Sequence, residues 1–326
     1  MKKIIDEGFL GIDVGSVSTN LVILDKDGRL MEKLYLRTQG QPIRVVQDGL
    51  RQMKDGLPEN LVIKGVGTTG SGRNLTSVIV GADIVKNEIT AHAVAAQFYY
   101  PEVRTILEIG GQDSKITILR DGIVIDFGMN TVCAAGTGSF LDHQAARLQI
   151  PIEEFGDLAL EAGNPVRIAG RCSVFAESDM IHKQQLGHNN RDIIAGLCEA
   201  LIRNYLNNVA KGKEISSPVV FQGGVAANKG IRLAFEKELG LPIRVPEHYE
   251  VMGAIGSALL AREKASKEKM KTNFKGFAVS DVDYQASSFE CDGCPNLCEV
   301  IEIKIAGRVV SRWGYRCNRW DLASNL

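Results

Sequence analysis

The sequence FLGIDVGSVSTNLVIL at residues 9–24 predicts a strand, a tight glycine turn and a second strand. Asp25–Gly28 then predicts a hairpin turn. The sequence TILEIGGQDSKITIL at residues 105–119 repeats this order: an apolar strand, an acidic residue, glycines, small polar residues and another strand. These two segments predict a structural duplication, in which each of two α/β halves begins with a β-hairpin.

Length and composition limit the possible classes of protein. The chain has 326 residues, enough for two domains with their own cores, with 44% hydrophobic and 24% charged residues. The net charge of -1 gives no indication of binding to nucleic acid or a membrane surface. No apolar core follows the lysines of Met1–Glu7, so this start does not resemble a signal peptide, and no apolar run is long enough to span a bilayer. We therefore expect a cytoplasmic protein.

Four glycine-rich turns are candidates for binding phosphate, because glycine lets backbone N–H groups approach closely and Ser or Thr adds hydroxyl donors. They lie at Asp13–Thr19, Gly110–Ser114, Ala135–Ser139 and Gly223–Asn228. Two of the turns follow an acidic residue on a strand, which suits a hydrated Mg²⁺ beside the β- and γ-phosphates. We expect Asp13 to order this metal, and Gln112 and Asp113 to position the attacking water. Neither a Walker lysine loop nor a dinucleotide fingerprint is present.

Three of these turns resemble the motifs of the acetate kinase–sugar kinase–Hsc70–actin superfamily. Asp13–Ser16 and Gly110–Asp113 resemble its two phosphate motifs, and Gly223–Ala226 resembles its adenosine motif. The resemblance implies an α/β, actin-like ATPase fold with two duplicated domains that close on ATP in the cleft between them. The expected nucleotide-binding residues are Gly15, Ser16, Val17, Ser18, Thr19, Gly110, Gly111, Gly136, Thr137, Gly138, Gly223, Gly224, Val225 and Ala226.

Two cysteine-bearing segments narrow the resemblance. The segments NTVCAAGTGSFLD at residues 130–142 and GRCSVFAES at residues 170–178 resemble the ATP-dependent activators of 2-hydroxyacyl-CoA dehydratases and the similar reductase of the double-cubane cluster protein, which are ATPases of the BadF/BadG/BcrA/BcrD type. The resemblance covers about residues 9–261. It implies a homodimer with a shared [4Fe–4S] cluster, and ATP hydrolysis that drives one low-potential electron into a partner iron–sulfur enzyme. A ferredoxin- or flavodoxin-like protein would be the electron donor.

The residues themselves are consistent with a shared cluster. A [4Fe–4S] cluster requires four thiolates, and the core offers only Cys133 and Cys172 beside expected turns. Two copies about a twofold axis supply four. Because the turn after Cys133 also borders the expected phosphate site, loss of the γ-phosphate would move the cluster. Either cysteine taken alone is equally consistent with a small buried apolar residue, and Cys198, inside a helical pattern, is expected to be such a packing residue.

Two further expectations concern the residue that compensates the phosphate charge and the role of the histidines. Many of these activators carry a lysine after the first phosphate turn, where this chain has Asn20. Lys115 is therefore a candidate for compensating the phosphate charge. We expect the histidines to be surface or packing residues, because they lack a matched third metal ligand. They are His92, His143, His182, His188 and His248.

The C-terminal segment predicts a second metal site. Its cysteines are spaced C-x₂-C-x₃-C-x₁₈-C, at Cys291, Cys294, Cys298 and Cys317. Zinc suits a small structural unit and is favoured here, whereas an iron–sulfur cluster would suit an electron relay. The segment is too small to fold on its own apolar residues, so we expect metal binding to stabilise it and the unit to dock on the core or on the partner.

The expected domains are 1–105 and 106–262 for the ATPase halves, 263–288 for a linker and 289–326 for the cysteine-rich tail. The charged run Arg262–Lys275 predicts either a helix extension or a solvated linker. Two other functions of the same superfamily remain open: a small-molecule kinase, and a regulatory binding module that uses ATP as a switch. Neither would need iron, and nothing in the sequence resembles a sugar-binding insertion.

Overall fold

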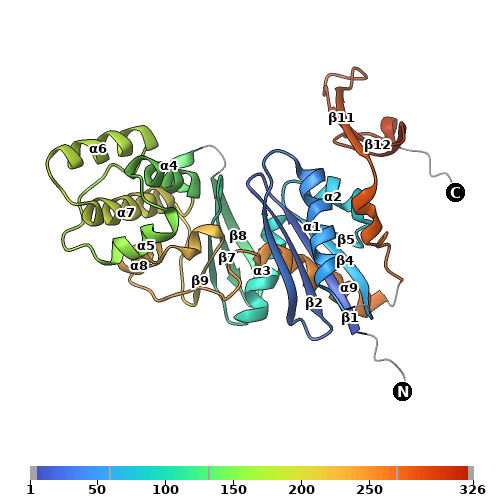
Figure 1. Ribbon diagram of the computed structural model, residues 1–326, viewed down its shortest axis with the longest axis horizontal. Helices are drawn as coiled ribbons and strands as arrows, with labels where there is room; N and C mark the ends of the chain where they lie inside the picture. Colours follow the sequence, from blue (N-terminus) through green and yellow to red (C-terminus); the bar gives the residue numbers. More distant parts are fainter. Residues whose placement is uncertain (1–5, 59, 131–132, 269–270, 322–326) are drawn as a thin grey trace. The chain divides into compact units, whose positions relative to one another are not determined.

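The computed structural model describes residues 6–58, 60–130, 133–268 and 271–321. The description leaves out residues 1–5, which belong to the start that does not resemble a signal peptide. It also leaves out Thr131 and Val132 of the first cysteine segment and the last five residues of the tail. Contacts group the chain into two compact units, Met1–Glu88 with Gly253–Leu326, and Ile89–Met252 (Figure 1). The domain boundaries predicted after residues 105, 262 and 288 stay predictions, since this grouping divides the chain at other positions.

The first unit contains a five-stranded sheet in the order β3-β2-β1-β4-β5. The chain runs antiparallel through the first three strands, and β4 and β5 then add in parallel. The strands are β1 (Asp6–Val14), β2 (Ser18–Asp25), β3 (Leu30–Arg37), β4 (Leu61–Thr69) and β5 (Ile84–Val85). The helices of this unit are α1 (Pro42–Gly56), α2 (Arg73–Val80) and α9 (Met252–Glu268). Helix α9 covers residues 262–268, so the first part of the charged run is a helix extension.

The second unit contains a sheet in the corresponding order, β8-β7-β6-β9-β10. Its strands are β6 (Thr105–Ile109), β7 (Ser114–Arg120), β8 (Ile123–Asn130), β9 (Val219–Gln222) and β10 (Ile243–Arg244). Its helices are α3 (Glu88–Tyr99), η1 (Ala134–Gly136), α4 (Gly138–Leu148), α5 (Ile152–Leu160), α6 (Ser173–Gln185), α7 (Asn190–Asn208), η2 (Gly224–Ala227) and α8 (Lys229–Leu239). Figure 1 shows helices α4 to α8 gathered on one side of this sheet.

The two sheets confirm the predicted duplication. In each, an antiparallel β-hairpin and a third antiparallel strand are followed by two parallel strands. The central strands are buried on both faces, which explains their nearly continuous apolar sequence. Separate apolar cores form in the two units, one around Leu10, Ile12 and Leu50, the other around Phe155, Tyr205 and Phe235.

The C-terminal segment forms a third sheet, in the order β11-β12-β13, that belongs to the first unit. Its elements are η3 (Phe277–Asp281), β11 (Tyr284–Glu290), β12 (Glu299–Ile305), β13 (Arg308–Trp313) and η4 (Asn318–Trp320). Val279, Tyr284 and Ile303 are buried in the same apolar cluster as the first sheet. Docking on the core, one of the two placements expected from the sequence, is therefore what the structure shows.

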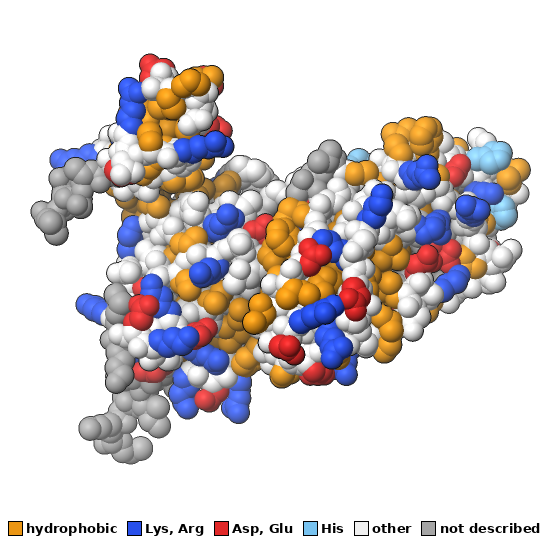
Figure 2. Space-filling view, turned by 180° about the vertical axis from the view of Figure 1, so that it is seen from behind, with side chains coloured by type: hydrophobic (Ala, Val, Ile, Leu, Met, Phe, Trp, Pro, Cys, Tyr) orange, Lys and Arg blue, Asp and Glu red, His pale blue; other side chains and the backbone are white. Residues whose placement is uncertain are grey.

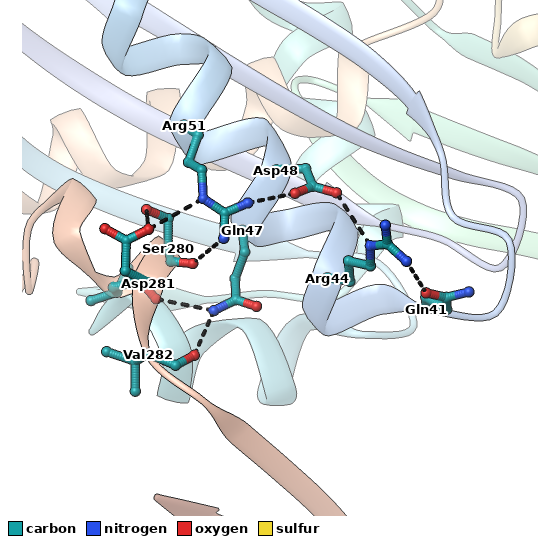
Figure 3. Close-up of polar contacts among 9 residues, drawn as sticks. Gln41, Arg44, Gln47, Asp48, Arg51, Ser280, Asp281 and Val282 are labelled. Carbon is teal, nitrogen blue, oxygen red and sulfur yellow. Dashed lines mark hydrogen bonds and ion pairs between the residues drawn. The ribbon is translucent and has the colours of Figure 1, made fainter.

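Polar contacts hold the start of this segment against α1 (Figure 3). The Gln47 side chain donates to the carbonyl oxygens of Val279 and Val282, at 3.3 and 2.7 Å. Arg51 donates to the Ser280 carbonyl at 2.5 Å and pairs with Asp281 at 3.3 Å. Residues 277–282 are thus fixed to α1 by backbone-directed hydrogen bonds, which a solvated linker would lack.

Candidate functional site

The first phosphate turn joins β1 to β2 and is fixed by backbone hydrogen bonds. The Gly15 N–H donates to the Ser18 carbonyl at 2.8 Å, and the Thr38 N–H donates to the Val17 carbonyl at 2.9 Å. The Thr38 hydroxyl also donates to the Gly15 carbonyl at 2.9 Å. Residues 15–18 therefore keep one shape, as a phosphate-binding turn requires.

Asp13 lies at the end of β1 beside a glycine loop that the sequence analysis did not assign to the site. Asp13 is in register with Asn20 on β2 and Thr69 on β4. Gly70 follows with φ +83°, and a Cβ there would lie 2.4 Å from an Asp13 carboxylate oxygen. Gly72 donates its N–H to the Val14 carbonyl at 2.9 Å. The glycine-rich sequence after the apolar β4 strand was the available signal for this loop.

The second phosphate turn, Gly110–Asp113, is joined directly to the start of α4. The N–H groups of Gly138 and Ser139 donate to the carbonyl oxygens of Gly110 and Gly111, both at 2.8 Å. The Ser139 hydroxyl also donates to the Gly111 carbonyl, at 2.5 Å. Because α4 begins five residues after Cys133, these three hydrogen bonds join the turn to the helix that follows the cysteine.

The predicted adenosine loop lies beside the same turn. Gly223 has φ +92°, and a Cβ at this position would lie 2.5 Å from the Ile109 carbonyl oxygen. A Cβ at Gly138 would lie 3.0 Å from both Gly110 O and Val225 Cγ2. The second unit therefore brings together three of the four predicted turns: Gly110–Ser114, Ala135–Ser139 and Gly223–Asn228.

A buried polar network supports Asp113. The Lys115 ammonium lies 2.8 Å from an Asp113 carboxylate oxygen and 3.1 Å from Glu108, and its side chain is 5% exposed. The buried His92 ring lies 3.4 Å from Glu108, and its Nδ1 lies 2.7 Å from Gln222 Nε2. Lys115 therefore does not offer a free charge to the phosphates, which corrects that expectation. His92 is likewise part of a polar network and more than a packing residue.

Burial and charge act in opposite directions on this network. Burial disfavours the ionised form of Glu108, but the positive charges of His92 and Lys115 lower the pKa of its carboxyl group below the usual value. Burial would also lower the pKa of Lys115, yet the carboxylates of Glu108 and Asp113 raise it above the usual value for lysine. The pair is therefore ionised at neutral pH, and Gln112 beside it is exposed to solvent.

The two core cysteines are each followed by a helical turn. Cys133 precedes η1 and Cys172 precedes α6, and both are partly exposed. The Cys133 N–H donates to the Asn130 side chain at 3.0 Å, and the Asn130 amide donates back to the Cys133 carbonyl at 2.8 Å. Both thiols are accessible to solvent, and their role as ligands of a metal cluster stays a prediction.

The third cysteine of the second unit, Cys198, is a packing residue, as expected. It is 1% exposed, and burial raises the pKa of its thiol to about 12.

Apolar side chains also reach the surface of the protein (Figure 2). Val174 and Phe175, two and three residues after Cys172, are 66% and 65% exposed.

The tail cysteines differ from one another in burial. Cys291 is buried, Cys298 is partly exposed, and Cys294 and Cys317 are exposed. The Cys291 N–H donates to the Cys298 carbonyl at 2.8 Å, which closes the turn between β11 and β12. Across the described ranges of the chain, no three His, Cys, Asp or Glu side chains form a group that could hold a metal ion. The four-cysteine metal site stays a prediction.

Two duplicated α/β units with glycine-rich phosphate turns define an actin-like ATPase fold, as the sequence predicted. The chain belongs to the BadF/BadG/BcrA/BcrD ATPase family, whose sequence profile matches residues 10–261. In the parts of the chain that the structure describes, no helix combines the length and apolar character needed to cross a membrane.

The chain is similar to proteins of known name over most of its length. It is 36% identical over 265 residues to the (R)-2-hydroxyglutaryl-CoA dehydratase activating ATPase of Acidaminococcus fermentans, covering 79% of this chain and 98% of that protein. It superimposes on the solved structure of the activator of 2-hydroxyisocaproyl-CoA dehydratase from Clostridium difficile with bound ADPNP. That match has a TM-score of 0.73 and 34% identity, and covers 81% of this chain and 98% of the other. These likenesses support binding of ATP and ADP.

Proposed function

We propose that this chain is an ATP-driven activator that delivers one low-potential electron to a partner iron–sulfur enzyme. The names of its similar relatives, which are activators of 2-hydroxyacyl-CoA dehydratases, support this class of partner. A dehydratase of this kind, or a double-cubane cluster protein, would be the acceptor. A ferredoxin- or flavodoxin-like protein would be the donor.

The observation that carries the proposal is the bonding of the Gly110–Gly111 carbonyls to the first N–H groups of α4. It joins a predicted phosphate turn to the helix that follows Cys133. This connection supports a coupling between bound nucleotide and the cysteine. Hydrolysis of ATP to ADP and phosphate removes the γ-phosphate from the turn, and this bonding would convey the change to the cysteine.

In the proposed ATPase step, Asp13 would order the hydrated Mg²⁺, and Gln112 and Asp113 would position the attacking water. Lys115 would orient Asp113 through its 2.8 Å contact. The backbone N–H groups of the turns, with the exposed hydroxyl of Ser16, would bind the phosphates. The predicted ligand Thr19 is fully buried, and its hydroxyl is bonded to that of Thr38 at 3.0 Å, so it would act by holding the turn in place.

Cys133 and Cys172 of two identical chains would together hold one [4Fe–4S] cluster. When bound there, such a cluster supplies a single electron at low potential, which the external donor restores. The exposed apolar pair Val174 and Phe175 beside Cys172 supports an interface at this end of α6. The site is incomplete in one chain, so the homodimer is part of the proposal.

The test is the iron content and nucleotide hydrolysis of protein purified without oxygen. We expect four core iron atoms per dimer, absorbance near 400 nm and Mg²⁺-dependent ATP hydrolysis. Cys133→Ser or Cys172→Ser should each remove the core iron and weaken dimerisation, because each change deletes two ligands of four. Cys198→Ala is the matched control and should keep both. All preparations carry Ser in place of the four tail cysteines, so that tail metal is not counted.

Three results would contradict the proposal. Four core iron atoms per monomer would rule out a shared cluster. A colourless protein that phosphorylates a small molecule would instead favour the kinase, and nucleotide-dependent partner binding without any reduction would favour the regulatory module.

A further inference from the structure

Asn204 on α7 lies between the two cysteine segments of the second unit. It is 1% exposed, and it precedes Tyr205, whose hydroxyl donates to the Lys115 carbonyl at 2.6 Å. Its side-chain amide has a donor end and an acceptor end, and the two ends face different segments of the chain.

The donor end holds the segment that leads to Cys172. Asn204 Nδ2 donates to the Gly170 carbonyl at 2.6 Å and lies 3.4 Å from the Arg171 carbonyl. The neighbouring Arg203 donates to the Ile168 carbonyl at 2.7 Å. Residues 165–170 have no helix or strand hydrogen bonding of their own, so their position is fixed by these contacts with α7 and by the bond from the Ala169 N–H to Asp179 on α6, at 2.8 Å.

The acceptor end faces the segment that follows Cys133. A Cβ at Gly136 would lie 2.8 Å from Asn204 Oδ1, so the backbone of this turn is directly against the oxygen. Asn204 Oδ1 is fully buried and accepts no hydrogen bond in the structure. Buried amide oxygens are almost always paired, because an unpaired one loses its hydration without compensation. The first N–H groups of a helical turn such as η1 have no acceptor within the turn itself.

We propose that Asn204 is a positioning residue that couples the two cysteine segments, and that its free amide oxygen accepts a backbone N–H from Ala134–Gly136 in one nucleotide state. The donor end stays bonded to Gly170. The hydrogen bond to the acceptor end forms or breaks when the Gly110–Gly111 turn shifts the start of α4. Nucleotide would thereby change how firmly the Cys133 segment is held against the Cys172 segment. This inference rests on the proposed function for its nucleotide, but its test requires no electron transfer.

The experiment is hydrogen–deuterium exchange on the full chain, purified without oxygen, with either ADP or a non-hydrolysable ATP analogue. In the wild type, we expect amides 134–136 to exchange at rates that differ by about fivefold or more between the two nucleotides, as one hydrogen bond would give. Asn204→Leu, of similar volume, should reduce this ratio to about one. Asn207→Leu, at an exposed position of the same helix, should keep the wild-type ratio.

Asn204→Asp separates the two ends of the amide. It keeps an acceptor toward Ala134–Gly136 but replaces the donor toward Gly170 with an oxygen. We expect the nucleotide-dependent ratio at 134–136 to persist and amides 168–172 to exchange faster with both nucleotides. If Asn204→Leu does not fold, Asn204→Asp still tests the proposal. Exchange of amides 168–172 at the wild-type rate would overturn the role of the donor end.

Other results would overturn the proposal directly. Equal exchange of amides 134–136 with both nucleotides in the wild type defeats it, and so does an unchanged ratio in a folded Asn204→Leu protein. Failure of the proposed function looks different. A wild type that binds neither nucleotide defeats the ATPase and this inference together, whereas one that hydrolyses ATP with equal exchange at 134–136 defeats this inference alone.

Discussion

Asp13 is the residue on which the ATPase activity should depend most. Its carboxylate is held at the end of β1 against Gly70, a position where any side chain would displace it. We predict that Asp13→Ala lowers Mg²⁺-dependent ATP hydrolysis by roughly a hundredfold or more, as loss of a group that stabilises transition-state charge does. Core iron should be retained, because the residue would order magnesium and not the cluster.

Phosphate release and iron content measure the two effects. Asp27→Ala, in the exposed hairpin turn after β2, is a matched control and should change neither. Turnover equal to the wild type in Asp13→Ala would remove Asp13 from the metal site.

Replacing Lys115 should lower both the unfolding free energy and the rate of ATP turnover. Lys115→Met would leave Glu108 buried without its lysine partner, a change that typically costs about 3–5 kcal/mol of unfolding free energy. It would also free Asp113 from its 2.8 Å contact and lower ATP turnover. Urea unfolding of the double variant Glu108→Gln/Lys115→Met should recover most of the stability. An additive loss in the double variant would contradict the pairing.

The same pair predicts a pH dependence. The lowered pKa of Glu108 contributes stability that is present above the unfolded value of about 4.3 and is lost as pH falls through the folded pKa. The raised pKa of Lys115 contributes stability that is present below the unfolded value of about 10.4 and is lost as pH rises through the folded pKa. The stability difference between wild type and the double variant should therefore be largest between these limits and shrink outside them.

At the scale of elements, the hairpins and turns could be predicted from the sequence. The contacts that these turns make with distant parts of the chain could not. The period of apolar residues and the glycines predicted both β-hairpins and four glycine-rich turns that the structure contains, and the phosphate-binding role of these turns stays a prediction. Glu108 and Lys115 are in register across the β6–β7 hairpin, so their pairing was also available from the sequence. The approach of Gly70 to Asp13 and of Gly136 to Asn204 was not, because each joins elements far apart in the chain.

The junction between α4 and the second phosphate turn gives an element-scale prediction. Gly138→Ala would place a methyl group 3.0 Å from both the Gly110 carbonyl and Val225, which forces α4 or the turn to shift. We expect ADP and ATP affinity to fall by roughly tenfold, equivalent to about 1.4 kcal/mol. Calorimetric titration measures this. Gly163→Ala, whose methyl group would meet no atom within 4 Å, is the control, and equal affinities in both variants would contradict the junction.

At the scale of the whole molecule, the tail is the part that the sequence described least well. Its cysteine spacing is visible in the sequence, but its packing is not, because Val279, Tyr284 and Ile303 join a core built largely from residues at the other end of the chain. The expected docking on the core is thus seen in the structure, whereas stabilisation of this small segment by metal stays a prediction. Burial against the first unit contributes apolar contacts that no sequence window of the tail contains.

This packing separates tail docking from metal binding. Replacing Cys291, Cys294, Cys298 and Cys317 by Ser should remove one metal ion per chain, zinc if the site is structural, while amides 277–284 keep their slow exchange. Gln47→Ala/Arg51→Ala should speed that exchange and leave the metal in place. Iron with sulfide in the tail would indicate a relay. A wild-type tail without any metal would defeat both assignments.

The duplicated sheets have unequal connections, and this has a consequence for engineering and for evolution. Between β3 and β4 the chain needs little more than α1, whereas between β8 and β9 it inserts η1 and helices α4 to α7. Every core cysteine lies in that single insertion, at Cys133, Cys172 and Cys198. The proposed cluster ligands are thus carried, as a cassette, by one repeat of a nucleotide-binding scaffold. Grafting the stretch between Asn130 and Val219 from one relative into another should therefore transfer partner preference while the ATPase framework keeps its topology.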